Sequence, residues 1–231
     1  MINNLRILAI VPARGGSKGI KDKNIKEIEG RPLIEYTIEA AKRCEYIDEI
    51  VVSTDSEKIA KAAKKAGAKV PFLRPDELAS DTARTIDVVL FTIEQLKLIG
   101  QEYDIVVLLQ PTSPLRDEDD ICGAIEKYVS CNMKSLVSVS EVSESPILMR
   151  QIVDETHMEK LLNINSTIRR QDMAKYYMVN GSIYINKIEE LNSDTSLNDN
   201  VIPYVMDRSH SVDIDDYVDI EVMKYYVNNR K

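Results

Sequence analysis

The 231-residue sequence contains no tryptophan, two phenylalanines, two histidines and three cysteines. Cys44, Cys122 and Cys131 are widely spaced and form no CxxC pair. This spacing argues against a zinc site or a disulfide framework and favours a reducing, cytoplasmic location. With only His157 and His210 available, the sequence shows no recognisable Ser-His-Asp or Cys-His arrangement. Catalysis by an enzyme nucleophile is therefore not expected.

Long apolar runs and excess positive charge are also missing. No run reaches transmembrane length and the first residues lack the layout of a signal peptide, so no membrane association is expected. The 30 Lys and Arg residues are outnumbered by 38 Asp and Glu residues, which gives a net charge of −8. Nucleic acid is therefore not an expected partner, because binding it needs a basic surface.

One short segment departs from this acidic balance. Residues 14–26 contain a single acid, Asp22, and five bases, which are Arg14, Lys18, Lys21, Lys23 and Lys26. A basic segment in an acidic protein predicts a local site for an anionic ligand such as a polyphosphate.

Strand-like and helix-like patterns alternate over the first 140 residues. Apolar runs and alternating segments predict strands over residues 7–11, 49–54, 69–73, 104–109 and 135–142. Amphipathic segments with helix start and stop signals predict helices over residues 32–43, 56–66, 85–99 and 118–129. This order predicts an α/β fold of Rossmann-like type, with a mostly parallel central sheet between helices.

The pattern changes after about residue 145. Short apolar segments separated by polar turns predict β-rich additions over residues 147–152, 158–162, 179–185 and 201–206. A final helix is expected over residues 216–228, with Asp215 or Asp216 as its cap. We therefore expect one domain over residues 1–231, in which residues from about 145 to 210 form a smaller embedded lobe. One of these β-rich additions is expected to project as a dimerisation arm.

The segment from Val11 to Asn24 carries the strongest functional signal. It follows the first expected strand, and ligands of open α/β sheets bind at the carboxyl ends of strands. Its glycines allow close backbone approach, and their N–H groups can surround anionic oxygens. Arg14 and Lys23 would add charge, and Ser17 a hydroxyl donor. The segment matches neither the Walker A pattern nor GxGxxG, which argues against P-loop and NAD sites. The alternative interpretation is a glycine-rich surface turn with solvated lysines.

Residues 7–24, ILAIVPARGGSKGIKDKN, resemble the opening signature of the acylneuraminate (CMP-sialic acid) cytidylyltransferases. Five later segments follow in the order of that family's motifs. They are IVVSTDSEKIA (50–60), FLRPDELASDTA (72–83), VVLLQPTSPLR (106–116), VNGSIYI (179–185) and HSVDIDD (210–216). The resemblance implies a homodimeric nucleotidyltransferase that uses CTP and a nine-carbon α-keto acid sugar. In that family the C2 hydroxyl of the sugar attacks the α-phosphate of CTP, and pyrophosphate leaves.

The resemblance also implies which residues bind the nucleotide. Those in the first segment are Arg14, Gly15, Gly16, Ser17, Lys23 and Asn24. Arg74 matches a residue that reads the cytosine edge, a role that suits the fixed donors of a guanidinium group. Asp81 and Thr85 fall in the same part of the chain, where Thr85 would keep a hydroxyl near the nucleotide. Without the motif, Arg74 would be interpreted as a surface arginine after a strand.

The resemblance places four residues on the acceptor side: Gln110, Arg170, Asn180 and Tyr184. The amide of Gln110 could serve the sugar or merely cap the end of a strand. Arg170 could pair with the sugar carboxylate or reach a phosphate.

The acceptor side also departs from the family pattern. Met178 and Val179 stand where many members have an arginine before the Asn-Gly, and Leu197 and Asn198 stand roughly where sialate enzymes have an aromatic pair. The expected acceptor is N-acetylneuraminate, with legionaminate as the alternative.

Two carboxylates, Asp213 and Asp215, flank Ile214 near the end of the sequence. In an extended segment residues i and i+2 point to the same side, where their charges repel unless a cation lies between them. Mg²⁺ prefers oxygen ligands, and the family motif implies a Mg²⁺ site here, with Mn²⁺ as a substitute. The expected catalytic residues are Lys23, Arg14, Asp213 and Asp215. Alternatively, Asp215 only caps the last helix and Asp213 is a solvated charge.

Two other functions remain open from the sequence. A cytidylyltransferase for the eight-carbon sugar ketodeoxyoctonate would have a related fold but a differently composed first loop. A nucleotide-sugar-binding protein without activity would have little need for Arg14, Lys23 and the carboxylate pair.

Overall fold

The computed structural model describes residues 2, 4–17 and 19–229, and its centre is a six-stranded sheet of order β10-β6-β9-β5-β1-β4. Strand β9 runs antiparallel to its neighbours β5 and β6, and the other neighbouring pairs are parallel. The bounds are β1 (Ile7–Pro12), β4 (Glu49–Ser53), β5 (Ile105–Leu109), β6 (Leu136–Glu141), β9 (Tyr177–Lys187) and β10 (Ile202–Val205). The prediction of an α/β fold with a mostly parallel sheet is confirmed.

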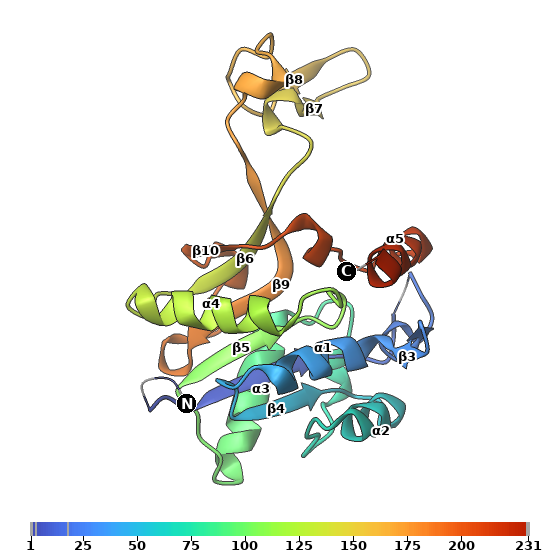
Figure 1. Ribbon diagram of the computed structural model, residues 1–231, viewed down its shortest axis with the longest axis vertical. Coiled ribbons are helices and arrows are strands. Elements are labelled where there is room, and N and C mark those ends of the chain that lie inside the picture. Colours follow the sequence, from blue (N-terminus) through green and yellow to red (C-terminus); the bar gives the residue numbers. More distant parts are fainter. Residues whose placement is uncertain (1, 3, 18, 230–231) are drawn as a thin grey trace.

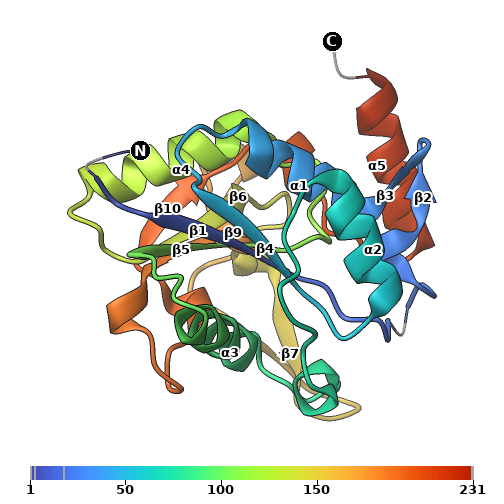
Figure 2. The ribbon, with the colours of Figure 1, turned by 90° about the horizontal axis from the view of Figure 1, so that it is seen from below.

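Helices cover both faces of this sheet (Figure 2). On one face lie α1 (Leu33–Arg43), α2 (Glu57–Ala66) and α4 (Glu118–Ser130), and on the other lies α3 (Thr85–Leu98). Alternate residues of β1 supply the two cores, because successive side chains of a strand point to opposite faces. Ile7, Ala9 and Val11 pack in the core under α1, α2 and α4, whereas Leu8 and Ile10 pack in the core under α3.

A smaller unit lies beside the main layers. Helix α5 (Tyr217–Asn229) packs there near the short antiparallel pair β2 (Glu27–Ile28) and β3 (Arg31–Pro32). The third core joins these elements through Ile28, Ile214 and Ile220. This core therefore connects the segment after β1 with the end of the chain, which are far apart in the sequence.

The prediction of a third strand over residues 69–73 is wrong, except at its first residue. Lys69 forms an isolated parallel bridge with Val51, in which its N–H donates to Ile50 and its carbonyl accepts from Val52. Pro71 follows two residues later and has no N–H to donate, so the ladder ends.

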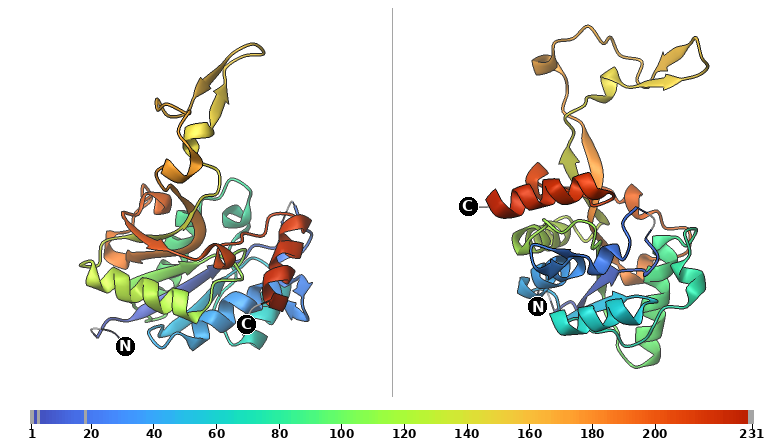
Figure 3. Two further views of the ribbon diagram at one scale, coloured as in Figure 1. Left: turned by 45° about the horizontal axis from the view of Figure 1, so that its top comes forward. Right: turned by 90° about the vertical axis from the view of Figure 1, so that its right-hand side faces the viewer.

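An arm leaves the sheet between β6 and β9 and projects from the molecule (Figures 1 and 3). It contains the hairpin β7 (Arg150–Ile152) and β8 (Met158–Lys160). The expected smaller lobe over residues 145–210 is too long, because β9 and β10 join the central sheet. Ile183 and Ile185 of β9 are fully buried in that sheet, which is where an apolar strand of this kind is most stable.

Two cysteines correct another expectation. Cys44, at the end of α1, and Cys122, in α4, form a disulfide across a Cα–Cα distance of 5.7 Å, whereas Cys131 is free. The pair is 78 residues apart in sequence, and the two helices that carry it lie side by side only in the folded protein. Spacing along the chain was therefore a poor guide to this contact.

The hydrogen bonds at the start of α5 show which of the two candidates, Asp215 or Asp216, caps this helix. The carboxylate of Asp216 accepts hydrogen bonds from the N–H groups of Val218 and Asp219, at 2.7 and 3.2 Å. Asp216 is therefore the cap, which leaves the side chain of Asp215 to face Lys23. None of the described helices has the length and apolar character needed to cross a membrane.

Candidate active site

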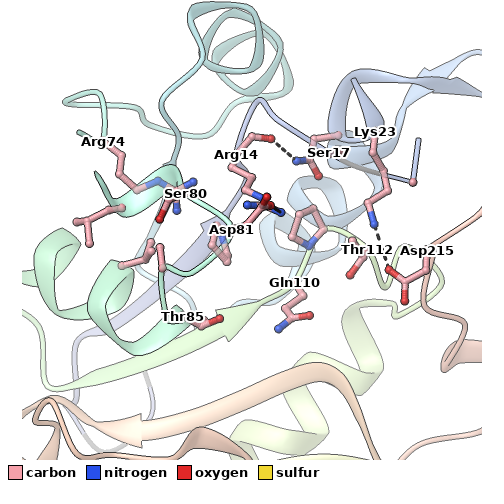
Figure 4. A pocket seen from close by; sticks show the side chains of 17 residues that line it. Arg14, Ser17, Lys23, Arg74, Ser80, Asp81, Thr85, Gln110, Thr112 and Asp215 are labelled. Atoms are coloured by element: carbon pink, nitrogen blue, oxygen red, sulfur yellow. Dashed lines mark hydrogen bonds and ion pairs between the residues drawn. The ribbon is translucent and has the colours of Figure 1, made fainter. Parts of the chain in front are cut away.

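A cavity of about 410 Å³ opens at the carboxyl ends of β1 and β5 (Figure 4). Its walls come from the loop after β1, the segment before α3, the residues after β5 and the segment before α5. The polar residues that line it are Arg14, Ser17, Lys23, Asn24, Arg74, Ser80, Asp81, Thr85, Gln110, Thr112 and Asp215. Segments from four parts of the chain thus meet at the edge of the sheet where ligands of open α/β folds bind.

The loop after β1 is held by polar contacts at both of its ends. The N–H of Gly15 donates to Asp55 at 2.9 Å, and the buried amide of Asn24 donates to the carbonyl of Arg14 at 3.0 Å. A Cβ atom at Gly19 would lie 2.5 Å from the carbonyl oxygen of Asp215, so only glycine fits there without a shift of the backbone. The loop therefore packs directly against the acidic segment. Gly15 and Gly16 belong to this loop but do not line the cavity.

Lys23 connects the loop with the acidic segment. Its ammonium group donates to the carbonyl of Ile214 at 2.6 Å and lies 3.3 Å from the carboxylate of Asp215. The side chain of Lys23 is 15% exposed and that of Asp215 is 80% exposed, so the carboxylate stays accessible from the cavity. Lys23 and its partners Ile214 and Asp215, 191 and 192 residues apart, therefore bring the basic loop and the acidic segment together at one cavity.

Asp213 does not line this cavity and lies in a separate recess of about 290 Å³. Although the residue as a whole is exposed, desolvation of its carboxyl group raises its pKa, and the charge of Asp215 raises it further. A hydrogen bond from Thr112 and the charge of Lys23 act in the opposite direction. Two mutually repelling carboxylates beside a hydroxyl form an oxygen-only donor set, which fits Mg²⁺.

Among the described residues, one group of three metal-ligating side chains lies elsewhere. Asp117, Asp120 and His210 have ligand atoms within 4.8 Å of one another. This group does not line the cavity.

Two arginines line the cavity, Arg14 from the loop after β1 and Arg74 from the segment before α3. Arg14 forms an ion pair with Asp81 at 2.7 Å, and Arg74 lies 3.7 Å from Asp55. Arg74 is only 5% exposed, and the desolvation that comes with burial lowers its pKa. Its Nε atom is buried and has no hydrogen-bond partner.

Two of the predicted acceptor residues, Gln110 and Tyr184, line a second cavity of about 450 Å³. Gln110 and Thr85 line both cavities, so they form the boundary between the two. Tyr184 lines the second cavity, and its hydroxyl donates to Asn198 at 2.9 Å.

The two remaining acceptor candidates lie elsewhere. Asn180 lines the recess of Asp213, but its amide is already bonded to Ser138 and Ser211. The backbone of Arg170 belongs to the projecting arm, and its side chain lies outside the described part of the structure. Asn180 therefore does not line the 450 Å³ cavity.

Three site residues received no role from the sequence. Asp55 holds Gly15 and faces Arg74, Ser80 lines the cavity, and Thr112 contacts Asp213. Asp55 and Thr112 come two and three residues after the ends of β4 and β5, and position after a strand was the signal that could have found them.

Comparison with known proteins identifies the family of this chain. A family model described as Cytidylyltransferase matches residues 8–229. CMP-N,N'-diacetyllegionaminic acid synthase of Legionella pneumophila is 38% identical, over 93% of this chain and 93% of the relative. Pseudaminic acid cytidylyltransferase of Campylobacter jejuni is 36% identical, over 97% and 98%. N-acylneuraminate cytidylyltransferase of Escherichia coli is 35% identical over 94% of this chain, which spans 51% of that longer relative.

Solved structures agree with this fold. A CMP:2-keto-3-deoxy-manno-octonic acid synthetase complexed with CTP superposes with a TM-score of 0.73 at 16% identity, over 96% of this chain and 98% of the other. A 4-diphosphocytidyl-2C-methyl-D-erythritol synthase superposes with a TM-score of 0.67 at 12% identity, over 97% and 99%. At such low identity the likeness shows a shared fold and nothing about the substrate.

Proposed function

Because this chain belongs to the cytidylyltransferase family, we propose that it transfers the cytidylyl group of CTP to the C2 hydroxyl of a nonulosonic acid. The products are the CMP-sugar and pyrophosphate. The observation that carries the proposal is the contact of Lys23 with Ile214 and Asp215, which brings the basic loop and the acidic segment to one cavity. An inactive binding protein would not need charges of both signs arranged around the same ligand.

In the proposed reaction, a bond forms between the sugar C2 oxygen and the α-phosphorus. The bond from that phosphorus to the oxygen of the leaving pyrophosphate breaks, and the hydroxyl proton passes to a base, for which a carboxylate of Asp213 or Asp215 is the candidate. Lys23 and Arg14 offset the negative charge that moves onto the pyrophosphate, and Ser17 and the loop N–H groups orient the phosphates. No enzyme nucleophile is required, because positioning and electrostatic stabilisation dominate phosphoryl-type transfers.

We propose that Asp213 and Asp215 bind Mg²⁺, for which Mn²⁺ can substitute. When bound, the ion offsets triphosphate charge and polarises the α-phosphate. The support is the oxygen donor set of the two carboxylates and the adjacent Thr112. Lys23 orients Asp215 from the loop side, at 3.3 Å.

The opposite wall of the cavity fits the cytosine base. We assign its recognition to Arg74, which lines the cavity and whose guanidinium group carries fixed donors that suit a pyrimidine edge. Asp55 holds this guanidinium group in place. Thr85, at the start of α3, places its hydroxyl on the side where the first cavity meets the second.

The second cavity is the proposed site of the acceptor sugar. N-acetylneuraminate is the acceptor expected from the sequence, and a diacetylated acceptor is the second candidate. Leu197 and Asn198 line this cavity, and neither of these two side chains is aromatic. The hydroxyl of Tyr184 donates a hydrogen bond to the side chain of Asn198. An open wall with an amide suits one further N-acetyl group, as in the acceptor named for the Legionella relative that is 38% identical.

A pyrophosphate-release assay tests both the activity and the acceptor. With CTP and Mg²⁺, we expect turnover of a nonulosonic acid and no turnover of ketodeoxyoctonate. N-acetylneuraminate, N,N'-diacetyllegionaminate and pseudaminate should be compared by kcat/KM at equal enzyme concentration. We expect at least about a 10-fold preference among them, because one group in a pocket is worth about 1–3 kcal/mol. Assays without metal or with ATP are the controls. If no nonulosonic acid releases pyrophosphate, the proposed function fails.

We also propose that the protein is a homodimer. The arm exposes apolar side chains that a monomer would leave in water, among them Leu148, Ile152 and Met158, at 55%, 78% and 63% exposure. Sedimentation equilibrium should give a mass of two chains. Replacing Ile152 and Met158 by Asp should give monomers, whereas the same change at exposed Leu98 and Ile99, on the body of the protein, should not. A monomeric unmodified protein would contradict the proposal.

A further inference from the structure

Outside the cavity, His210 joins the segment before the two carboxylates to helix α4. The Nδ1 atom of His210 lies 2.7 Å from a carboxylate oxygen of Asp120 and 3.6 Å from one of Asp117. His210 ends the short 3₁₀ turn Arg208–His210, three residues before Asp213. It is the only described histidine in such a contact with α4, because His157 lies in the arm beside Glu159.

Asp120 is itself rigidly held. It is 8% exposed, and it forms a reciprocal capping box with Asp117. The N–H of Asp120 donates to Asp117 at 3.1 Å, and the N–H of Asp117 donates back to Asp120 at 3.3 Å. A buried carboxylate that accepts a backbone N–H within a capping box is a fixed acceptor, so the imidazole that donates to it is fixed as well.

The segment that follows His210 has no regular secondary structure of its own. Residues 211–214 lie in neither a helix nor a strand, so side chains and single hydrogen bonds determine their positions. Three further contacts hold this segment. Asn180 donates to Ser211 at 3.0 Å, the N–H of Ile214 donates to Thr112 at 2.8 Å, and Lys23 donates to the carbonyl of Ile214.

From this geometry we propose that His210 and Asp120 are a positioning pair that sets Asp213 and Asp215 for metal and nucleotide binding. The inference rests on the proposed function. Neither residue lines the 410 Å³ cavity, so the pair acts through the segment and not on the substrate. Groups of this kind, which orient metal ligands without touching the metal, typically change metal affinity by about 10- to 100-fold when removed.

The same side chains could instead be read as a metal site. Their surroundings argue against it, because the fully buried guanidinium group of Arg116 is close enough to interact electrostatically with Asp117 and Asp120. One oxygen of each carboxylate also accepts a backbone N–H of the capping box. A second cation would have to displace these contacts and approach a positive charge.

The test compares His210→Ala and Asp120→Ala with the matched controls His157→Ala and Asp119→Ala, which change an exposed histidine in the arm and an exposed aspartate in the same helical turn. The primary measurement is Mn²⁺ binding in the presence of CDP, followed by electron paramagnetic resonance, because it needs no turnover. The second is pyrophosphate release as a function of Mg²⁺ concentration.

We expect His210→Ala and Asp120→Ala each to weaken Mn²⁺ binding about 10-fold, and the double variant to be no weaker than either. His210→Asn, which keeps a donor near the position of Nδ1, should recover most of the affinity. The control variants should bind Mn²⁺ with the same affinity as the unmodified protein. The Mg²⁺ concentration for half-maximal activity should rise in parallel, with little change in the KM of the acceptor.

Three outcomes would overturn the inference. They are unchanged Mn²⁺ binding in His210→Ala, additive losses in the double variant, and the disappearance of one bound Mn²⁺ per chain while the other keeps its affinity. The last would identify the cluster as a metal site. An unmodified protein that binds Mn²⁺ and CDP but releases no pyrophosphate would refute the proposed function and leave the positioning pair standing.

Discussion

Replacing Lys23 by alanine should lower kcat by about 100- to 1,000-fold, the usual effect of removing one preorganised donor that stabilises transition-state charge. The side chain of Lys23 is only 15% exposed, because the loop and the acidic segment cover most of it. In this setting its charge is poorly screened by water and acts strongly on a bound triphosphate. Steady-state pyrophosphate release at saturating CTP and Mg²⁺ measures the change.

The matched control is Lys21→Ala, which removes an exposed cation from the same loop and should leave kcat within about 2-fold of the unmodified protein. Losing the hydrogen bond from Lys23 to the carbonyl of Ile214 should also cost about 1.5–3 kcal/mol of folding free energy. A thermal melt and a circular dichroism spectrum separate this loss from the effect on turnover. Full turnover in the folded Lys23→Ala protein would remove Lys23 from the mechanism.

Replacing Asp215 by alanine should lower activity about 100-fold at moderate Mg²⁺, or roughly 2.7 kcal/mol of transition-state stabilisation. Part of the loss should be recovered at high Mg²⁺, because Asp213 and the phosphate oxygens remain as ligands. The variant also removes one of the charges that raise the pKa of Asp213. Activity should be measured over a Mg²⁺ titration and repeated with Mn²⁺.

The next residue supplies the control for this prediction. Asp216 carries the same charge but caps α5 through Val218 and Asp219. Asp216→Ala should therefore lower the melting temperature and leave the Mg²⁺ dependence unchanged, whereas Asp215→Ala should do the reverse. If Asp215→Ala lowers the melting temperature and Asp216→Ala changes the Mg²⁺ dependence, Asp215 is a structural residue and the metal assignment is wrong.

Local sequence patterns predicted most helices and strands well, and their failures have physical causes. Ile7–Pro12 and Ile105–Leu109 are fully apolar runs, and a buried parallel strand leaves few other ways to place such a run. Residues 69–73 share that apolar character, but Pro71 ends the pairing after one bridge. The limits of the arm could not be predicted, because the segments of β9 and of the hairpin look alike until one of them finds a place in the sheet.

Some features of the candidate site could likewise be predicted from the sequence, and others could not. The basic loop was visible in the sequence because its glycines and charges are neighbours along the chain. The burial of Arg74 was not visible, since it depends on Asp55 and on the segments that fold over it. The disulfide of Cys44 and Cys122 was missed for a similar reason, because it forms where α1 and α4 meet.

The amino-acid sequence alone determined the α/β alternation, the basic, glycine-containing loop after β1 and the presence of two carboxylates with one residue between them. These features are encoded by residues close together in the chain, where backbone geometry decides what they can do. Only the tertiary structure decided that Lys23 reaches Asp215, that Asp216 and not Asp215 caps α5, and that His210 meets Asp120. Each of these depends on distant segments packing around a common core, and the free energy of that packing cannot be read from any one segment.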